Sequence, residues 1–269
     1  MTTPRVDVAR EPYSVRHILA LLLIGAVGGL LSGAFGVGGG TVMVPLMILL
    51  LGFDQRRAAA TSLAAIVPTS IAGSLGYLAK GELDLVAAVL IALGGIGGTL
   101  IGTKLLRTLP LGWLRWMFIA LLLLVAIRLF FEVPSRGADL VLTPWTIAGL
   151  LVLGLVVGVA AGMFGIGGGV IIVPVLVSLF GVSDLIAKGT SLVAMIPTAT
   201  AGTVANARAG MMRLSDGLII GASAVVASLG GVALAFLLPP RLSAILFGIF
   251  MLIVVAELSL RAWRLRAKR

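Results

Sequence analysis

The most constraining feature of this chain is a glycine-rich interruption that occurs twice inside apolar sequence. The first copy, GAFGVGGG at residues 33–40, precedes an apolar run that contains Pro45. The second copy, GMFGIGGG at residues 162–169, precedes a similar run that contains Pro174. Each Gly in a helix interior costs roughly 1 kcal/mol relative to Ala, so each copy is predicted to interrupt a helix.

The composition places these interruptions in a membrane protein. The chain is 60% hydrophobic and 11% charged, with a mean hydropathy of +1.21, whereas soluble domains carry about 25% charged residues. The apolar runs are continuous and about 20 residues long, which is typical of membrane-spanning helices and not of barrel strands. The sequence therefore predicts an all-α polytopic membrane protein. The net charge of +10 is attributed to cytoplasmic loops, and no nucleic-acid partner is expected.

The two halves of the chain repeat each other without a gap. Residues 33–52 and 162–181 are identical at 10 of 20 positions when aligned. The agreement continues through TSLAAIVPT at residues 61–69 and TSLVAMIPT at residues 190–198. We therefore expect two repeats of five hydrophobic segments each. The predicted boundaries are a cytoplasmic tail at 1–15, repeats at 16–133 and 145–262, a linker at 134–144 and a basic cytoplasmic tail at 263–269.

The run that follows the first interruption, at residues 41–51, is too short to cross a bilayer. A helix of that length spans roughly 17 Å, about half of a membrane. We interpret it as a short broken or re-entrant helix, and its second copy likewise. The alternative, in which each interruption divides a single crossing, leaves four elements in each half.

An odd number of segments per repeat inverts the second repeat relative to the first. The positive charges agree with this topology, because 15 of the 20 Lys and Arg residues fall on the side of the N-terminus. The other five are Lys80, Arg128, Arg136, Lys188 and Arg241. Both termini are therefore predicted to be cytoplasmic. With four elements per half the charge asymmetry largely disappears, so the charges favour re-entrant helices.

Inverted repeats with interrupted helices are a hallmark of secondary transporters. The helix after each interruption begins with unpaired N–H groups, which with the helix dipole form an anion site. Gly at these positions lets a ligand approach the backbone, although Gly also serves simple close packing. The candidate substrate-binding glycines are Gly36, Gly38, Gly39, Gly40, Gly165, Gly167, Gly168 and Gly169.

Duplicated hydroxyl residues form a second group of candidates. We expect Thr61-Ser62 and Thr190-Ser191 to open long helices after the short ones. With Pro68-Thr69 and Pro197-Thr198 one to two turns further on, they would line a polar face, although such hydroxyls also bond to carbonyls of their own helix. Asn206, whose counterpart is Tyr77, is expected to face the cavity or another helix because an unpaired amide in lipid is costly. These candidates are Thr61, Ser62, Thr69, Thr190, Ser191, Thr198 and Asn206.

The ionisable residues argue against chemistry on a substrate. No Asp, Glu, His, Lys or Arg is expected near the centre of an apolar segment, the chain has no Cys, and its one His, His17, lies at a segment edge. We expect no catalytic residues, no metal site and no cofactor, so the protein is not predicted to be an enzyme. A charged solute would then be held by backbone amides and hydroxyls, which favours a small anion.

The pattern G-x-F-G-[VI]-G-G-G, followed by Pro and by T-S-L-x-A-x-[IV]-P-T and present in both halves, resembles the TauE/SafE family of sulfite-exporter-like proteins. The resemblance covers roughly residues 18–260. It implies a transporter of small sulfur-containing anions, such as sulfite, sulfoacetate or thiosulfate, in the bacterial inner membrane. The family's motif positions fall on Gly36, Gly38–Gly40, Pro45, Thr61-Ser62 and Pro68-Thr69, and on their counterparts in the second half.

The sequence therefore predicts an inner-membrane transporter of a small sulfur-containing oxyanion that works by alternating access. Its expected partners are that anion and the lipid bilayer, and a homo-oligomer is compatible with the sequence. Two alternatives stay open at this stage. One is a channel-like permease for another small solute, and the other is a non-transporting membrane scaffold or assembly factor.

Overall fold

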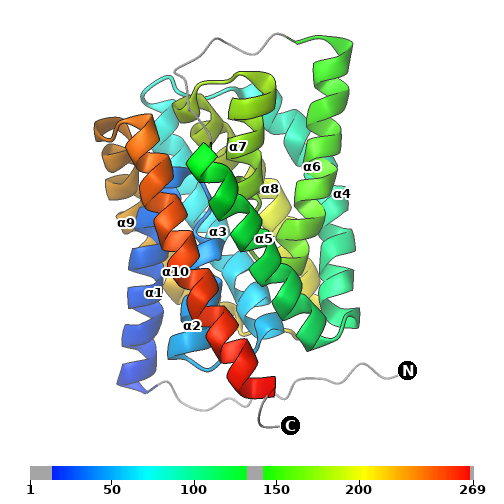
Figure 1. Ribbon diagram of the computed structural model, residues 1–269, viewed down its shortest axis with the longest axis vertical. Coiled ribbons are helices and arrows are strands. Elements are labelled where there is room, and N and C mark those ends of the chain that lie inside the picture. Colours follow the sequence, from blue (N-terminus) through cyan, green and yellow to red (C-terminus); the bar gives the residue numbers. More distant parts are fainter. Residues whose placement is uncertain (1–13, 132–141, 267–269) are drawn as a thin grey trace.

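A computed structural model describes residues 14–131 and 142–266, and within these residues the chain is helical with no strand (Figure 1). The ten helices are α1 (Val15–Phe35), α2 (Gly40–Leu50), α3 (Gln55–Leu78), α4 (Leu85–Thr108), α5 (Leu111–Phe131), α6 (Pro144–Phe164), α7 (Gly169–Phe180), α8 (Asp184–Arg208), α9 (Leu214–Leu237) and α10 (Pro240–Arg266).

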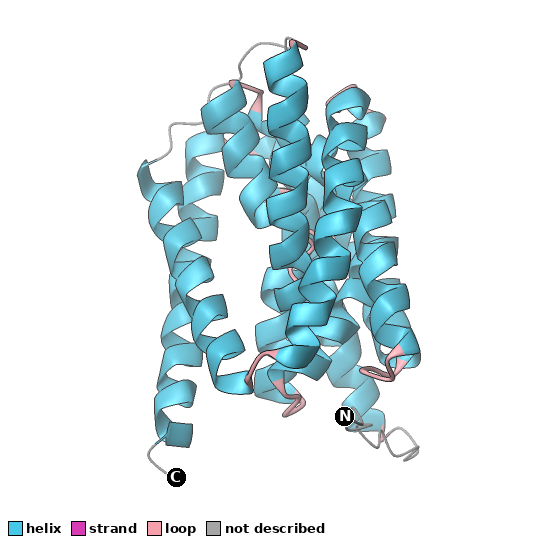
Figure 2. Ribbon diagram, turned by 90° about the vertical axis from the view of Figure 1, so that its right-hand side faces the viewer, coloured by secondary structure: helices cyan, strands magenta, loops and turns pink. Residues whose placement is uncertain are grey.

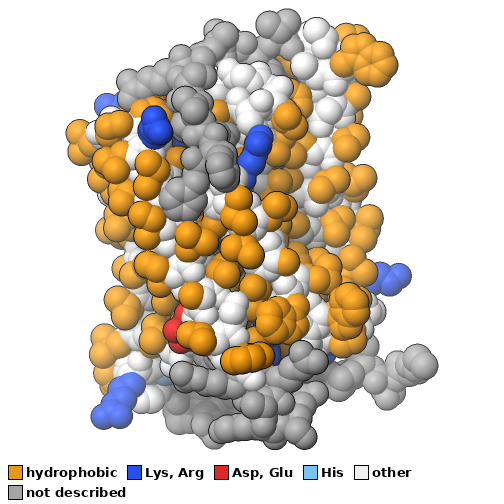
Figure 3. Space-filling model, in the orientation of Figure 1, with side chains coloured by type: hydrophobic (Ala, Val, Ile, Leu, Met, Phe, Trp, Pro, Cys, Tyr) orange, Lys and Arg blue, Asp and Glu red, His pale blue; other side chains and the backbone are white. Residues whose placement is uncertain are grey.

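The all-α polytopic fold is confirmed. Among the described residues, seven helices are long and apolar enough to cross a membrane, namely α1, α3, α4, α5, α6, α9 and α10. The helices α2 and α7 are apolar but short. Large apolar side chains such as Leu93, Val152 and Val226 are exposed, and Figure 3 shows hydrophobic side chains spread over most of the face that is drawn in colour. Exposing so much apolar surface to water would be unfavourable, whereas the hydrocarbon core of a bilayer accommodates it.

The helix directions place α2 and α7 as halves of hairpins. In Figure 1, α1 begins at the lower end of the molecule and α2 returns toward that end, whereas α6 begins at the upper end and α7 returns upward. The start of α1 and the end of α10 lie at the same end of the molecule (Figure 2). Each glycine-rich interruption therefore connects a long helix to a short one that turns back.

Glycine stripes bring the long helices into backbone contact. A Cβ added at Gly25, Gly29 or Gly33 of α1 would collide with backbone carbonyls of α9. The same holds for Gly154, Gly158 and Gly162 of α6 against α4. The α1–α9 and α6–α4 pairs are the same contact with the two halves exchanged. Small residues allow this close approach, which drives helix association where lipid leaves no hydrophobic gain.

Helices α3 and α8 contact each other. In addition, α3 packs on α9 and α8 packs on α4, while α5 and α10 pack chiefly on each other. Helix α3 begins at Gln55, where the Asp54 carboxylate accepts a hydrogen bond from Arg57 N at 2.7 Å and caps the helix. Helix α10 continues through residues 263–266, which were predicted as part of the C-terminal tail. Most of the predicted N-terminal tail and linker lies outside the described residues.

Candidate functional site

The two interruptions have the same backbone conformation. Gly36, Gly38 and Gly39 have φ angles of 68°, 73° and 76°, and their counterparts Gly165, Gly167 and Gly168 have 71°, 75° and 102°. These angles lie in the left-handed region, where a Cβ is costly and Gly is the default residue. The repeated G-x-G-G spacing is therefore dictated by three left-handed positions in each copy.

The structure brings the two interruptions into direct contact. A Cβ at Gly40 would collide with the carbonyl oxygen of Gly165, and a Cβ at Gly169 would collide with that of Gly36. These two contacts are related by the repeat. The first residue of each short helix thus packs on the interruption of the other half, although the two are far apart in sequence.

Apolar side chains fill the space between the interruptions in this conformation. A Cβ at Gly38 would lie 2.6 Å from Met195 Sδ, and one at Gly167 would lie 2.7 Å from the same atom. Ile66, the repeat counterpart of Met195, approaches both glycines from α3. Ile66 and Met195 are both fully buried. The candidate glycines therefore surround a packed apolar contact.

Ser62 and Ser191 tie the two halves together. Ser62 Oγ lies 2.6 Å from the carbonyl oxygen of Gly165 and 2.9 Å from that of Ala59. Ser191 Oγ lies 2.6 Å from the carbonyl oxygen of Gly36 and 2.7 Å from that of Lys188. Each hydroxyl has one proton to donate, and in both cases the shorter distance is the one to the carbonyl of the opposite half. Each serine therefore links its helix to the interruption of the opposite half.

The remaining polar candidates have different surroundings. The hydroxyls of Thr69 and Thr198 donate to carbonyls one turn earlier in their own helices, and Thr190 Oγ1 accepts a hydrogen bond from Asp84 N at 3.0 Å. Thr61 Oγ1 and both amide atoms of Asn206 are buried with no hydrogen-bond partner among the described residues. The pairs Thr61-Ser62 and Thr190-Ser191 were expected to open their helices. In the structure α3 and α8 begin about two turns earlier, at Gln55 and Asp184.

A cavity of about 50 Å³ lies beside the second interruption. It is bounded by the end of α1, the first turns of α7, the start of α8 and the start of α10. Phe35 and Phe247 line it and stack on each other, with ring centroids 4.5 Å apart. Gly169 and Val170, the first two residues of α7, also line it. Their amides precede the first one that bonds within the helix, Ile171 N to Gly168 O at 2.9 Å.

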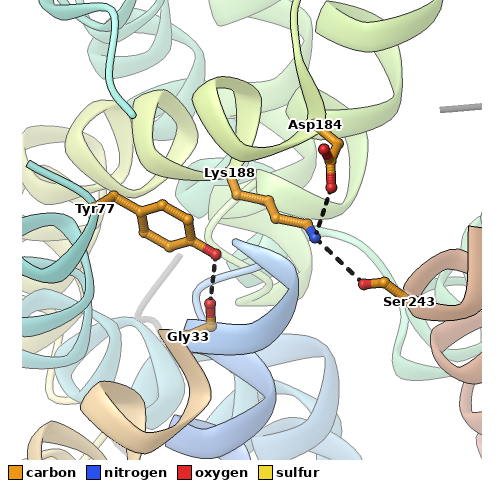
Figure 4. Close-up of polar contacts among 5 residues, drawn as sticks. All are labelled: Gly33, Tyr77, Asp184, Lys188 and Ser243. Carbon is orange, nitrogen blue, oxygen red and sulfur yellow. Dashed lines mark hydrogen bonds and ion pairs between the residues drawn. The ribbon is translucent and has the colours of Figure 1, made fainter. Parts of the chain in front are cut away.

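The same cavity contains a buried ion pair. Lys188 Nζ lies 3.2 Å from Asp184 Oδ2 and 3.3 Å from Ser243 Oγ, and all three residues line the cavity (Figure 4). The Lys188 and Asp184 side chains are only 6% and 7% exposed. The backbone of Lys188 packs against Gly36, since a Cβ at Gly36 would lie 2.6 Å from Lys188 Cα. Lys188 thus packs on the first interruption and lines a cavity that the start of the second short helix also borders.

From the sequence, Lys188 was counted only among the five positive charges opposite the N-terminus, and Asp184 was not a candidate. In the structure, α8 begins at Asp184 and contains both residues. Both lie in the first turns of α8 and not near the centre of an apolar segment, yet Lys188 packs on Gly36. The available signal was a departure from the repeat: the counterparts of Asp184, Lys188 and Ser243 are Gln55, Ala59 and Leu114.

Two further contacts fix the helices around this site. Tyr77 Oη donates a 2.8 Å hydrogen bond to the carbonyl oxygen of Gly33, the first residue of the first interruption (Figure 4). A second ion pair, outside the cavity, joins Arg57 of α3 to the buried Asp216 of α9 at 3.1 Å. Among the described residues, no group of three or more His, Cys, Asp or Glu side chains is arranged to hold a metal ion.

Comparison with known proteins gives a match to one family model, described as Sulfite exporter TauE/SafE, over residues 3–129 and 150–269. The chain belongs to the TauE/SafE family. The match covers both repeats, so the duplicated motif is the family's and not a chance similarity of one half. Relatives of this TauE/SafE protein are named as probable membrane transporters. Together with the family match, these names indicate a membrane transporter and do not specify its substrate.

One relative, a "Probable membrane transporter protein" of Xylella fastidiosa (strain Temecula1), is 27% identical over 93% of this chain and 97% of its own length. "Probable membrane transporter protein YdhB" of Bacillus subtilis is 27% identical over 69% of this chain and 77% of its own length. "Probable membrane transporter protein YunE" of the same organism is 32% identical over 47% of this chain, which spans 46% of that protein. No solved structure matches this chain significantly.

Proposed function

We propose that this TauE/SafE protein transports a small sulfur-containing oxyanion, such as sulfite or sulfoacetate, by alternating access. The observation that supports this most is the cavity at the start of α7, where the Lys188 ammonium group and the first amides of a helix border the same space. The family description, sulfite exporter, supports the substrate class.

The residues of the cavity suit an anion of that kind. A helix N-terminus carries a partial positive charge and unpaired N–H donors, and Lys188 adds a full charge on a buried side chain. The Ser243 hydroxyl supplies a third donor within 3.3 Å of the ammonium. A tetrahedral or pyramidal oxyanion presents several acceptor oxygens at once, so it can meet donors that come from three helices.

The glycine-rich interruptions would act as the moving part of the pathway. Gly36, Gly38–Gly40 and their counterparts allow the backbone conformations that hold α2 and α7 against each other. The contact of Ile66 and Met195 between them closes the path in this conformation. Transport would require this contact and the packing of the short helices to rearrange, which exposes the anion first on one side and then on the other.

The charge distribution supports the orientation in the bacterial inner membrane, with both termini cytoplasmic. The cavity lies toward the end of the molecule where α8 and α10 begin, opposite to the start of α1 (Figure 1). It would therefore belong to the periplasmic half of the protein.

Transport by purified protein in proteoliposomes tests this function. Sulfite, sulfoacetate, thiosulfate and sulfate are offered in turn, and we expect at least one to move with saturable kinetics. The double variant Asp184→Asn/Lys188→Met should lose transport while remaining folded, because removing both partners leaves no uncompensated buried charge. Lys104→Met, at an exposed position of α4, should transport normally. Unsaturable flux would favour a pore, and absence of any flux would contradict a transporter of these anions.

A further inference from the structure

We propose that Asp184 takes up one proton when an anion binds at Lys188, so that the anion and the proton occupy the cavity together. This inference rests on the proposed function, because it assumes that the cavity at the start of α7 receives an anion. It adds a coupling residue and a coupled ion to that site.

The geometry of Asp184 motivates the proposal. Its Oδ2 atom pairs with Lys188 Nζ at 3.2 Å, but its Oδ1 atom is buried with no hydrogen-bond partner among the described residues. The side chain is 7% exposed and lines the cavity. Buried polar atoms in native proteins nearly always have a partner, so an orphaned carboxylate oxygen at a cavity points to something that binds there.

The electrostatic balance of the cavity identifies that partner as a proton. With Asp184 ionised and Lys188 protonated, the pair is neutral. A monovalent anion added to it would leave a net negative charge in a cavity whose lining residues are mostly apolar, and an uncompensated buried charge costs several kcal/mol. One proton from bulk water, bound to Asp184, restores neutrality: Lys188 then pairs with the anion, and the new O–H group is a donor for an oxyanion. No bond of the anion itself forms or breaks.

Among the described residues that line the cavity, Asp184 carries the one carboxylate. The lining residues from α1, α7 and α10 are apolar apart from Ser243 and the backbone. On the other side of α8, Tyr77 and the backbone of Glu82 pack against Gly189, and the backbone of Asp84 bonds to Thr190. Neither Glu82 nor Asp84 lines the cavity.

The repeat places this coupling on one half of the molecule. Gln55 and Ala59 occupy the positions that correspond to Asp184 and Lys188, and Ala59 packs on Gly165 as Lys188 packs on Gly36. The two-fold scaffold therefore has a titratable pair beside one interruption and an uncharged pair beside the other. Coupled proton uptake is accordingly expected from the side toward which α8 and α10 begin.

The test uses wild-type protein in lipid nanodiscs and methanesulfonate, a monoanion that stays ionised from pH 5 to 8. Proton uptake on binding is measured with a pH indicator in weak buffer, and Kd is measured across that range. We expect one proton per bound anion and a Kd that rises by about tenfold per pH unit at the alkaline end, as linkage of one proton requires. Sulfate, which is also fully ionised in this range, serves as a second probe.

Asp184→Asn should bind methanesulfonate without proton uptake and with an affinity independent of pH. Asp216→Asn removes a buried, ion-paired carboxylate outside the cavity and should keep the proton uptake of the wild type. Anion binding by the wild type without proton uptake would overturn the coupling and leave the proposed function intact, and so would proton uptake retained by Asp184→Asn. If neither anion binds wild-type protein at any pH, the anion site itself is wrong and both proposals fail.

Discussion

At the scale of single residues, the centre of this protein is held by backbone contacts that only glycine and serine permit. The left-handed glycines turn the chain, the first glycine of each short helix packs on the other half, and a serine from each half bonds to the opposite interruption. Substitutions at these positions should therefore affect the junction between the halves before they affect the outer helices.

Gly40→Ala should destabilise the protein by about 1–3 kcal/mol, the usual cost of overpacking. Its new methyl group would collide with the carbonyl oxygen of Gly165, which is backbone and cannot rotate away. Thermal unfolding in detergent measures the effect. Gly97→Ala is the matched control, since nothing lies within 4 Å of its added Cβ, and it should be neutral or slightly stabilising. An equal melting temperature for Gly40→Ala and wild type would contradict the contact.

Ser191→Ala should cost about 1–3 kcal/mol, because it leaves the buried carbonyl of Gly36 without a partner. The hydroxyl of Ser191 lies 2.6 Å from that carbonyl oxygen. Thr200→Ala removes a hydroxyl that bonds to Ile196 of its own helix at an exposed position and serves as the comparison. The same melting experiment applies, and equal shifts for the two variants would show that the link between the halves contributes nothing.

At the scale of elements, the short helices decide how the chain passes through the membrane. Helices α2 and α7 have 11 and 12 residues, about half of what a crossing needs. In the structure they turn back toward the end at which their own repeat began (Figure 1). This arrangement agrees with the charge asymmetry, which depends on five segments in each half.

Leu51→Cys and Phe180→Cys test this topology, because they are repeat counterparts at the ends of α2 and α7. The chain has no native Cys, so each variant carries a single thiol. A membrane-impermeant maleimide applied to intact cells should label Phe180→Cys and not Leu51→Cys, and disrupting the membrane should expose both. Labelling of both variants from one side would contradict the re-entrant arrangement of the short helices.

At the scale of the whole molecule, a two-fold scaffold carries a site that does not follow the two-fold relation. Ser243 borders the cavity with Lys188, whereas its counterpart Leu114 is fully buried in the largest apolar cluster. The protein therefore has different interiors on its two sides.

Ser243→Cys should react with a small cationic thiol reagent much faster than Leu114→Cys, by about tenfold or more, because the reagent needs space beside the thiol. Saturating methanesulfonate should slow the reaction of Ser243→Cys, since the anion would occupy the same cavity. The rates are followed by mass spectrometry of protein in nanodiscs. Equal reactivity of the two variants would contradict the asymmetry of the interior.

The sequence by itself determined the membrane fold, the repeat and the two interruptions. These follow from local properties: apolar runs of spanning length, and Gly at positions that require a left-handed backbone. The family motif followed from the same residues. Each of these features depends on a short stretch of consecutive residues and not on how the helices pack against each other.

Only the tertiary structure decided what surrounds the interruptions. Ile66 and Met195 fill the space that the glycines were expected to offer to a ligand, and Ser62 and Ser191 bond to the opposite halves. Lys188 packs on Gly36, and with Asp184 it lines a cavity at the start of α7, a placement that neither residue's position in the sequence indicated. Such contacts join residues from different repeats, and their partners depend on how the helices pack. The order of residues along one segment therefore does not specify them.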